Sequence, residues 1–216
     1  MKIIALLGIA TLTTTAAAQY PTPPKPLPEA EEITLALSAA PEEVSSKSDV
    51  WVLRDTGYAK VRTGTNGGAC MVGRDLHEGS RYPICFDREG AQTTLRREIM
   101  EGNLRARGKS EDEVIRAVEA ATANGTLTMP ASTALSYMMS AQQVLFSSPK
   151  AEGFRVGAWS PHVMILAPAQ LSARQLGLAE QDSKVDAISI HEEGKHHSEL
   201  VIKLPAWSNG TPVTRK

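Results

Sequence analysis

The chain has 216 residues, of which 42% are hydrophobic and 22% are charged, and its formal net charge is −1 at pH 7. These values are typical of a globular protein that is large enough to bury its own core. The near-neutral charge excludes the basic excess that nucleic acid or anionic lipid would require. After the first residues, no stretch is long and apolar enough to cross a bilayer, which takes about 20 residues. We therefore expect no nucleic-acid partner and no membrane span.

The first 28 residues have the pattern of an export leader followed by a linker. Lys2 precedes an apolar run, and Ala16-Ala17-Ala18 supplies the small residues of a cleavage site before Gln19. A buried N-terminal strand is the alternative interpretation. Five of the thirteen prolines then fall within residues 20–28, which favours extended polyproline II. We predict a signal peptide at 1–18, a Pro-rich linker at 19–28 and a single domain at 29–216. The protein would act in the periplasm or outside the cell.

Export bears on the two cysteines, Cys70 and Cys85, because thiols pair in oxidising compartments. Only one intramolecular pairing exists, and we predict that disulfide. Closing a loop of about 15 residues contributes roughly 3 kcal/mol in the chain-entropy model. A reactive thiol or a thiolate metal ligand is the alternative for either residue.

The expected elements begin with an amphipathic helix at 29–40, which carries acids in its first turn and Ile33, Ala36, Leu37 and Ala40 at helical spacing. Pro41 ends it. Three short β-type runs follow between residues 49 and 75, separated by Gly-containing turns, and this pattern predicts an antiparallel meander. The stretch G-T-N-G-G precedes the third run, so we interpret it as a turn.

The middle of the chain predicts two helices with a short connection. The first covers 91–107, with Gly108 as its C-cap. The second begins at Ser110, which forms a capping box with Glu113, and ends at Asn124-Gly125. Two further apolar runs predict strands, and a hairpin centred on Gly194 closes the chain. The expected fold is α+β: an antiparallel sheet, made of the N-terminal three-strand meander plus the C-terminal hairpin, packed against the helical pair and closed by one disulfide.

Motif searches find no phosphate-binding loop, no dinucleotide fingerprint and no G-x-S-x-G elbow in the sequence, and we expect no cofactor. The histidines carry more information. H-E-E-G-K-H differs from the zinc-protease motif because its histidines are five residues apart, so on a helix they would diverge. On a hairpin, His191 could face His196 or His197 and take up zinc with Glu192, Glu193 or Asp186 as a further ligand. We interpret this stretch as a solvated charged turn and expect no metal, with the zinc site as the alternative.

His162 and His197 are the candidate catalytic residues. His162 follows Ser160-Pro161 at the start of an apolar strand. Its ring could serve as a general base or ligand, or it could cap the strand by bonding to the backbone. If His162 and His197 flank neighbouring strands, they could meet at one end of the sheet.

A resemblance supports export. The segments W-V-L-R-D-T-G-Y-A-K-V-R-T-G-T-N-G-G-A-C-M-V-G-R-D and S-P-H-V-M-I-L-A-P resemble uncharacterised exported bacterial proteins over most of the mature chain, and the resemblance implies no activity. We expect an exported, soluble protein that acts as a non-catalytic binding or envelope-associated module, with another envelope component or a small molecule as its partner. The alternative is an exported hydrolase or metal-dependent enzyme that uses the C-terminal histidines. A binding module should present an apolar patch, whereas an enzyme should gather its histidines in a cleft.

Overall fold

The computed structural model describes residues 25–74, 80–146, 155–157, 159–178, 187–195 and 197–214. The predicted leader and most of the predicted linker therefore lie outside the described residues. The helices are α1 (Glu29–Leu37), α2 (Glu42–Ser45), α3 (Arg88–Gln92), α4 (Thr94–Ala106) and α5 (Glu111–Ala123). The strands are β1 (Asp49–Arg54), β2 (Gly57–Arg62), β3 (Ala69–Gly73), β4 (Tyr82–Phe86), β5 (Ala134–Met138), β6 (Leu145–Phe146), β7 (Arg155–Gly157), β8 (His162–Leu166), β9 (Ile188–His191) and β10 (Glu199–Lys203).

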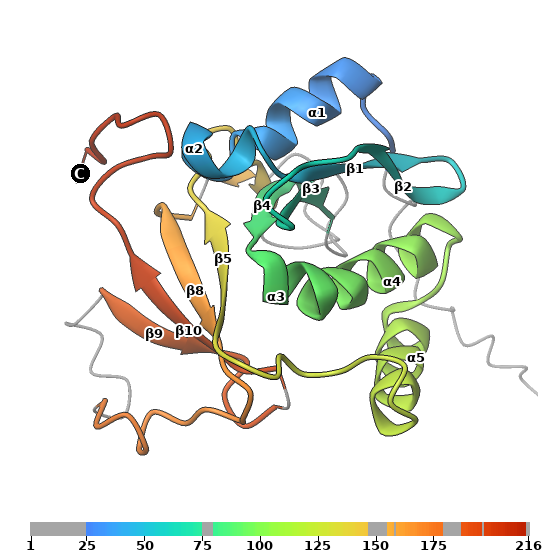
Figure 1. Ribbon diagram of the computed structural model, residues 1–216. Coiled ribbons are helices and arrows are strands. Elements are labelled where there is room, and N and C mark those ends of the chain that lie inside the picture. The colour runs from blue at the N-terminus through green and yellow to red at the C-terminus, as the bar shows by residue number, and fades with distance from the viewer. Residues whose placement is uncertain are drawn as a thin grey trace, which may run out of the picture.

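One eight-stranded sheet organises the molecule, in the order β2-β1-β3-β4-β5-β8-β10-β9, and β6 and β7 form a separate hairpin. Helix α1 contacts β1, β3 and β4 on one face. Helices α3 and α4 contact strands β2 to β5, and α5 contacts α4. Figure 1 shows α1 above the first four strands, α3 and α4 below them, and β5, β8, β10 and β9 continuing the sheet to the left. The α+β class is as predicted, but of the predicted helical pair it is α4 that contacts the sheet, while α5 packs on α4.

The sheet is mixed, however, so the predicted antiparallel meander is wrong in its third strand. Strands β1 and β2 form an antiparallel hairpin, but β3 pairs with the other edge of β1 in the parallel direction. The G-T-N-G-G turn explains this, because it is bonded to the chain that precedes β1. Asn66 Nδ2 donates to the Val44 carbonyl at 2.9 Å, and Thr65 N donates to the Lys47 carbonyl at 2.7 Å. The connection therefore passes the start of β1 and places β3 beyond it.

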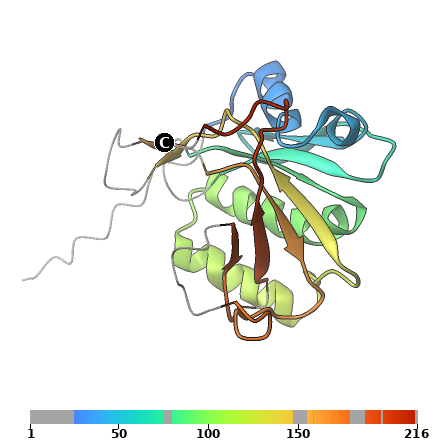
Figure 2. The same ribbon diagram turned by 90° about the vertical axis from the view of Figure 1, so that its left-hand side faces the viewer.

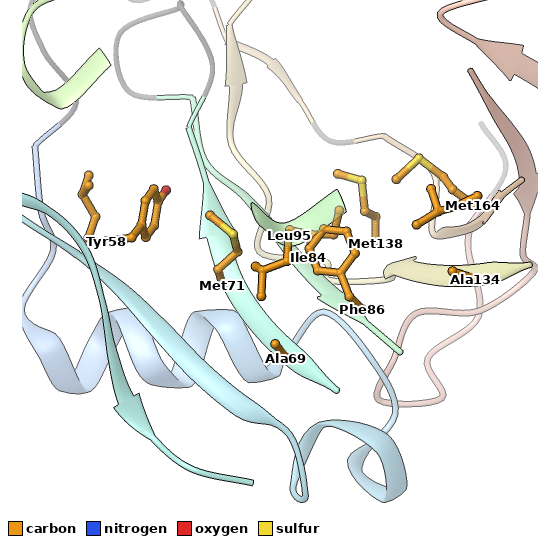
Figure 3. Close-up of a cluster of buried hydrophobic side chains, with 11 residues drawn as sticks. Tyr58, Ala69, Met71, Ile84, Phe86, Leu95, Ala134, Met138 and Met164 are labelled. Carbon is orange, nitrogen blue, oxygen red and sulfur yellow. The ribbon is translucent and has the colours of Figure 1, made fainter. Parts of the chain in front are cut away.

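The disulfide between Cys70 and Cys85 is confirmed, with an S–S distance of 1.99 Å. The two residues lie directly opposite each other in the antiparallel β3–β4 pair, and both are fully buried. They belong to the smaller of two apolar clusters, which lies between the sheet and α1. The larger cluster lies on the side of α3 and α4, and Figure 3 shows Met71, Ile84 and Phe86 in it.

Helix α1 is present as predicted, but its buried face differs from the expected stripe. Leu35 and Ala36 are buried, and Glu32 is fully buried beside them. Glu32 Oε2 accepts a bond of 2.7 Å from Arg74 Nη2, whose side chain is also buried. Its Oε1 accepts a longer bond of 3.4 Å from Leu53 N. A buried carboxylate requires such a counter-ion, and Arg74 lies 42 residues away along the chain.

The helical pair and the C-terminal hairpin are confirmed. Ser110 and Glu113 exchange both bonds of the capping box at the start of α5. Gly108 adopts a φ of 73°, the left-handed conformation expected after the end of α4. Strands β9 and β10 pair in the antiparallel direction. Within the described ranges, no helix combines the length and apolar character needed to span a membrane. The prediction of a single domain over 29–216 stays a prediction.

Candidate functional site

His162 is the first residue of β8, and its ring closes the start of that strand. Its Nδ1 lies 2.7 Å from the Ser160 carbonyl oxygen, which can only accept, so Nδ1 donates. The Trp159 ring meets the His162 ring edge to face, with 6.2 Å between centroids. Burial lowers the pKa of His162, and the bond to Ser160 offsets this only in part. The ring is therefore neutral at pH 7 and caps the strand.

His191 lies at the opposite end of the same strands. It is the last residue of β9 and pairs with Glu199, the first residue of β10, while His162 pairs with Lys203, the last residue of β10. The two rows are four residue steps apart on β10, which corresponds to roughly 13 Å along a strand. His162 and His191 are thus not brought together at one end of the sheet.

A charge network surrounds Glu199. Its carboxylate lies 3.3 Å from His191 Nδ1 and 3.5 Å from Arg97 Nη2. The hydrogen bond to Glu199 raises the pKa of His191 against the effect of burial. Arg97, on α4, also lies 3.4 Å from Glu98. Its Nη1 is buried and finds no hydrogen-bond partner within the described residues.

The network continues along α4 at helical spacing. Glu101 lies 3.8 Å from Arg97 Nε and 3.2 Å from Arg105 Nη1, and Arg105 binds Glu111 on α5 through two nitrogens. Burial, followed by the charge of Glu98, raises the pKa of Glu101 to about 7, although both arginines oppose the shift. The side chains that link α5, α4 and β10 therefore change their total charge near neutral pH.

His197 lies in the hairpin loop and lines a small, partly open pocket. Its Nε2 is 3.4 Å from Glu192. Burial, followed by the charge of Arg97, lowers the pKa of His197 to about 4. The neighbouring Ser198 hydroxyl accepts a bond of 2.6 Å from Leu171 N. The pocket walls come from the start of α4, the end of α5, the 127–130 segment, the end of β8 and the start of β10.

The choice between a charged turn and a zinc site in the hairpin stays open, because His196 and Asp186 lie outside the described residues. Glu193 accepts a bond of 2.6 Å from Ala173 N. Among the residues that the structure describes, no three His, Cys, Asp or Glu side chains gather in a way that could hold a metal ion. His191 pairs with the carboxylate of Glu199, a residue that the sequence argument did not single out.

A different feature is found on the other face of β5, β8, β10 and β9. Along β5 and β8, buried residues alternate with half-buried ones. The buried residues face α3 and α4, and the half-buried ones point to the opposite side. There the strand register aligns two rows of apolar side chains, which we call the uncovered face: Leu135, Ile165, Leu200 and Ile190 in one row, and Tyr137, Val163, Ile202 and Ile188 in the other.

None of the eight residues of the uncovered face is charged. Ile188 is 41% exposed, and the other seven are half-buried. Helix α1 covers the same side of the sheet mainly over β1, β3 and β4, and Tyr137 at the margin of the uncovered face packs against the apolar cluster beneath α1. Figure 2 shows β5, β8 and β10 side by side, with α4 and α5 behind them and no described helix in front. The face measures about 19 Å by 14 Å from standard strand spacings, or roughly 270 Å².

Neither Arg97 nor the uncovered face was predicted from the sequence. Arg97, Glu101 and Arg105 follow one another every four residues in a predicted helix, so their pairing could have been found. The uncovered face gives a weaker signal, because in β8 the residues Val163 and Ile165 alternate with the equally apolar Met164 and Leu166. No family model, no curated protein and no solved structure matches the chain.

Proposed function

We propose that the protein is a non-catalytic binding module that acts after export, and that it binds its partner through the uncovered face. The observation that carries the proposal is the pair of four-residue apolar rows across β5, β8, β10 and β9. A contiguous exposed apolar patch on a monomer is often functional. The buried Cys70–Cys85 disulfide supports export, because such bonds persist in oxidising compartments.

The size of the face suits a moderate affinity. Removing roughly 270 Å² of apolar surface from water contributes about 7 kcal/mol at 25 cal/mol per Å². Loss of translational and rotational freedom offsets much of this gain. The partner would therefore add a polar rim around the apolar centre, as most protein interfaces do.

A hydrolase or a metal-dependent enzyme is the second candidate, favoured by one observation. The neutral His197 borders the pocket beside Glu199 and Arg97, so it has an unprotonated ring nitrogen at pH 7, although a pKa of about 4 makes it a weak base. Against this role, the adjacent Ser198 hydroxyl is engaged by Leu171 N. His197→Ala should remove any ester or peptide hydrolysis if this candidate is right.

Nile red, a neutral dye that fluoresces on apolar surfaces, tests the binding proposal. Ile165→Asn changes the centre of the uncovered face, and Ile115→Asn makes the same change on α5, where Ile115 is 47% exposed. At dilute protein concentration, we expect the native chain and Ile115→Asn to bind the dye and Ile165→Asn to bind it several-fold less. Equal binding by the two variants, or no binding by the native chain, would remove the support for this proposal.

A further inference from the structure

We infer that the uncovered face is covered by a second copy of this chain, in a two-fold symmetric, face-to-face pair of sheets. This inference rests on the proposed function and names the partner. Three properties of the face support a second copy as its partner: its lack of charge, its area and its position in the sheet.

Charge favours self-association. A symmetric dimer brings the same surface of both copies together, so a surface that carries charge of one sign would repel its copy, whereas an uncharged surface would not. The eight side chains of the uncovered face include no charged residue, and Tyr137 carries the only polar group among them. The charged residues of the same strands lie on the other side, where Glu199 pairs with His191 and Arg97.

The area of the uncovered face sets the expected affinity of the dimer. Two copies would bury about 540 Å² of apolar centre, taken as twice the strand-spacing estimate of roughly 270 Å². Specific interfaces bury at least about 1,200 Å² in total, counting a polar rim around the centre. The apolar centre thus supplies a little under half of the area that the smallest specific interfaces bury. A reversible dimer that dissociates at micromolar concentrations is expected, in place of an obligate one.

The position of the uncovered face in the sheet favours face-to-face packing of two sheets over edge-to-edge pairing of their strands. Strand β9 forms one edge of the sheet but has only four residues, so it offers few backbone groups to a neighbour. The two apolar rows run across all four strands, and Leu200 and Ile165 pair directly at their centre. Two such sheets pack at about 10 Å with side chains interdigitated. Each copy then supplies the layer that α1 supplies over β1, β3 and β4.

Sedimentation velocity, run from low micromolar to millimolar protein, tests the inference on the chain as an exporting host produces it. We expect a monomer–dimer equilibrium in the native chain. Leu200→Glu should raise the dissociation constant at least about tenfold, because it places like charges at the centre of the contact. Ile115→Glu, on α5, should leave the constant unchanged. Circular dichroism and melting curves establish that each variant is folded, and Leu200→Gln replaces Leu200→Glu if the latter unfolds.

Two results would overturn the inference. One is a native chain that stays monomeric over the whole range, and the other is a dimer that Leu200→Glu does not weaken. Dye binding separates either result from failure of the proposed function. If the chain is monomeric but binds Nile red through Ile165, the proposed binding face stands and only the second copy is ruled out as its partner. A monomer that binds no dye overturns both.

Discussion

The buried ion pair between Glu32 and Arg74 gives a sharp prediction about stability. Glu32→Gln keeps the shape of the side chain and keeps an oxygen for the bond from Leu53 N. It removes the negative charge that faces Arg74 at 2.7 Å, where the side chains are 0% and 2% exposed. The guanidinium then loses its buried counter-ion on α1, which costs about 3–5 kcal/mol. That is a large part of the roughly 5–15 kcal/mol by which a domain of this kind is stable.

Urea unfolding, followed by circular dichroism, measures this loss. Glu29→Gln is the matched control, since Glu29 pairs with Arg54 at the same 2.7 Å but both side chains are more than half exposed. An exposed pair contributes about 0–1 kcal/mol. The double variant Glu32→Leu with Arg74→Met should recover most of the loss, because apolar replacement of a buried pair is often neutral. Equal losses for Glu32→Gln and Glu29→Gln would refute the reasoning.

Two further predictions concern the disulfide and the charge network. Cys70→Ala combined with Cys85→Ala should lower the free energy of unfolding by roughly 3 kcal/mol, and reduction should raise the native mass by about 2 Da; two free thiols in the exported protein would contradict this. Glu101 has a pKa raised from 4.5 to about 7 in the folded chain, so the folded state binds its proton more tightly than the unfolded state. Its contribution is present below pH 4.5 and is lost as pH rises to about 7. Unfolding between pH 4 and 8 should therefore show a smaller decline for Glu101→Gln than for the native chain, and identical slopes would contradict the assignment.

The sequence was sufficient for features that depend on neighbouring residues. The capping box at Ser110 and Glu113 needs residues three apart, and the C-terminal hairpin needs a turn around Gly194. The Cys70–Cys85 bond followed from having only two cysteines in a chain with an export leader pattern.

Features that depend on distant residues were not predictable. The parallel pairing of β3 with β1 follows from bonds that join the 62–66 segment to residues 44–48. The burial of Glu32 depends on Arg74, which lies in another element. No local pattern shows that such a carboxylate is paired, so a polar residue at position 32 is assigned to the solvent side.

The uncovered face shows a different limit of prediction from sequence. Strand β8 reads H-V-M-I-L, and β10 reads E-L-V-I-K, so hydrophobic residues occupy both sides of each strand. This pattern is typical of strands buried on both sides. A sequence does not tell whether the second layer comes from the same chain or from a partner. The register of the four strands, together with the place of α1, provides that information.

Two neighbouring residues of β8 allow the most direct test of the account. Met164 points to the α4 side and is 6% exposed, whereas Ile165 points to the uncovered face. In dilute solution, the account predicts that Met164→Asn lowers the free energy of unfolding by about 3–5 kcal/mol and Ile165→Asn by about 1 kcal/mol. Similar large losses for both would mean that the chain itself covers this face, and they would contradict a binding surface there.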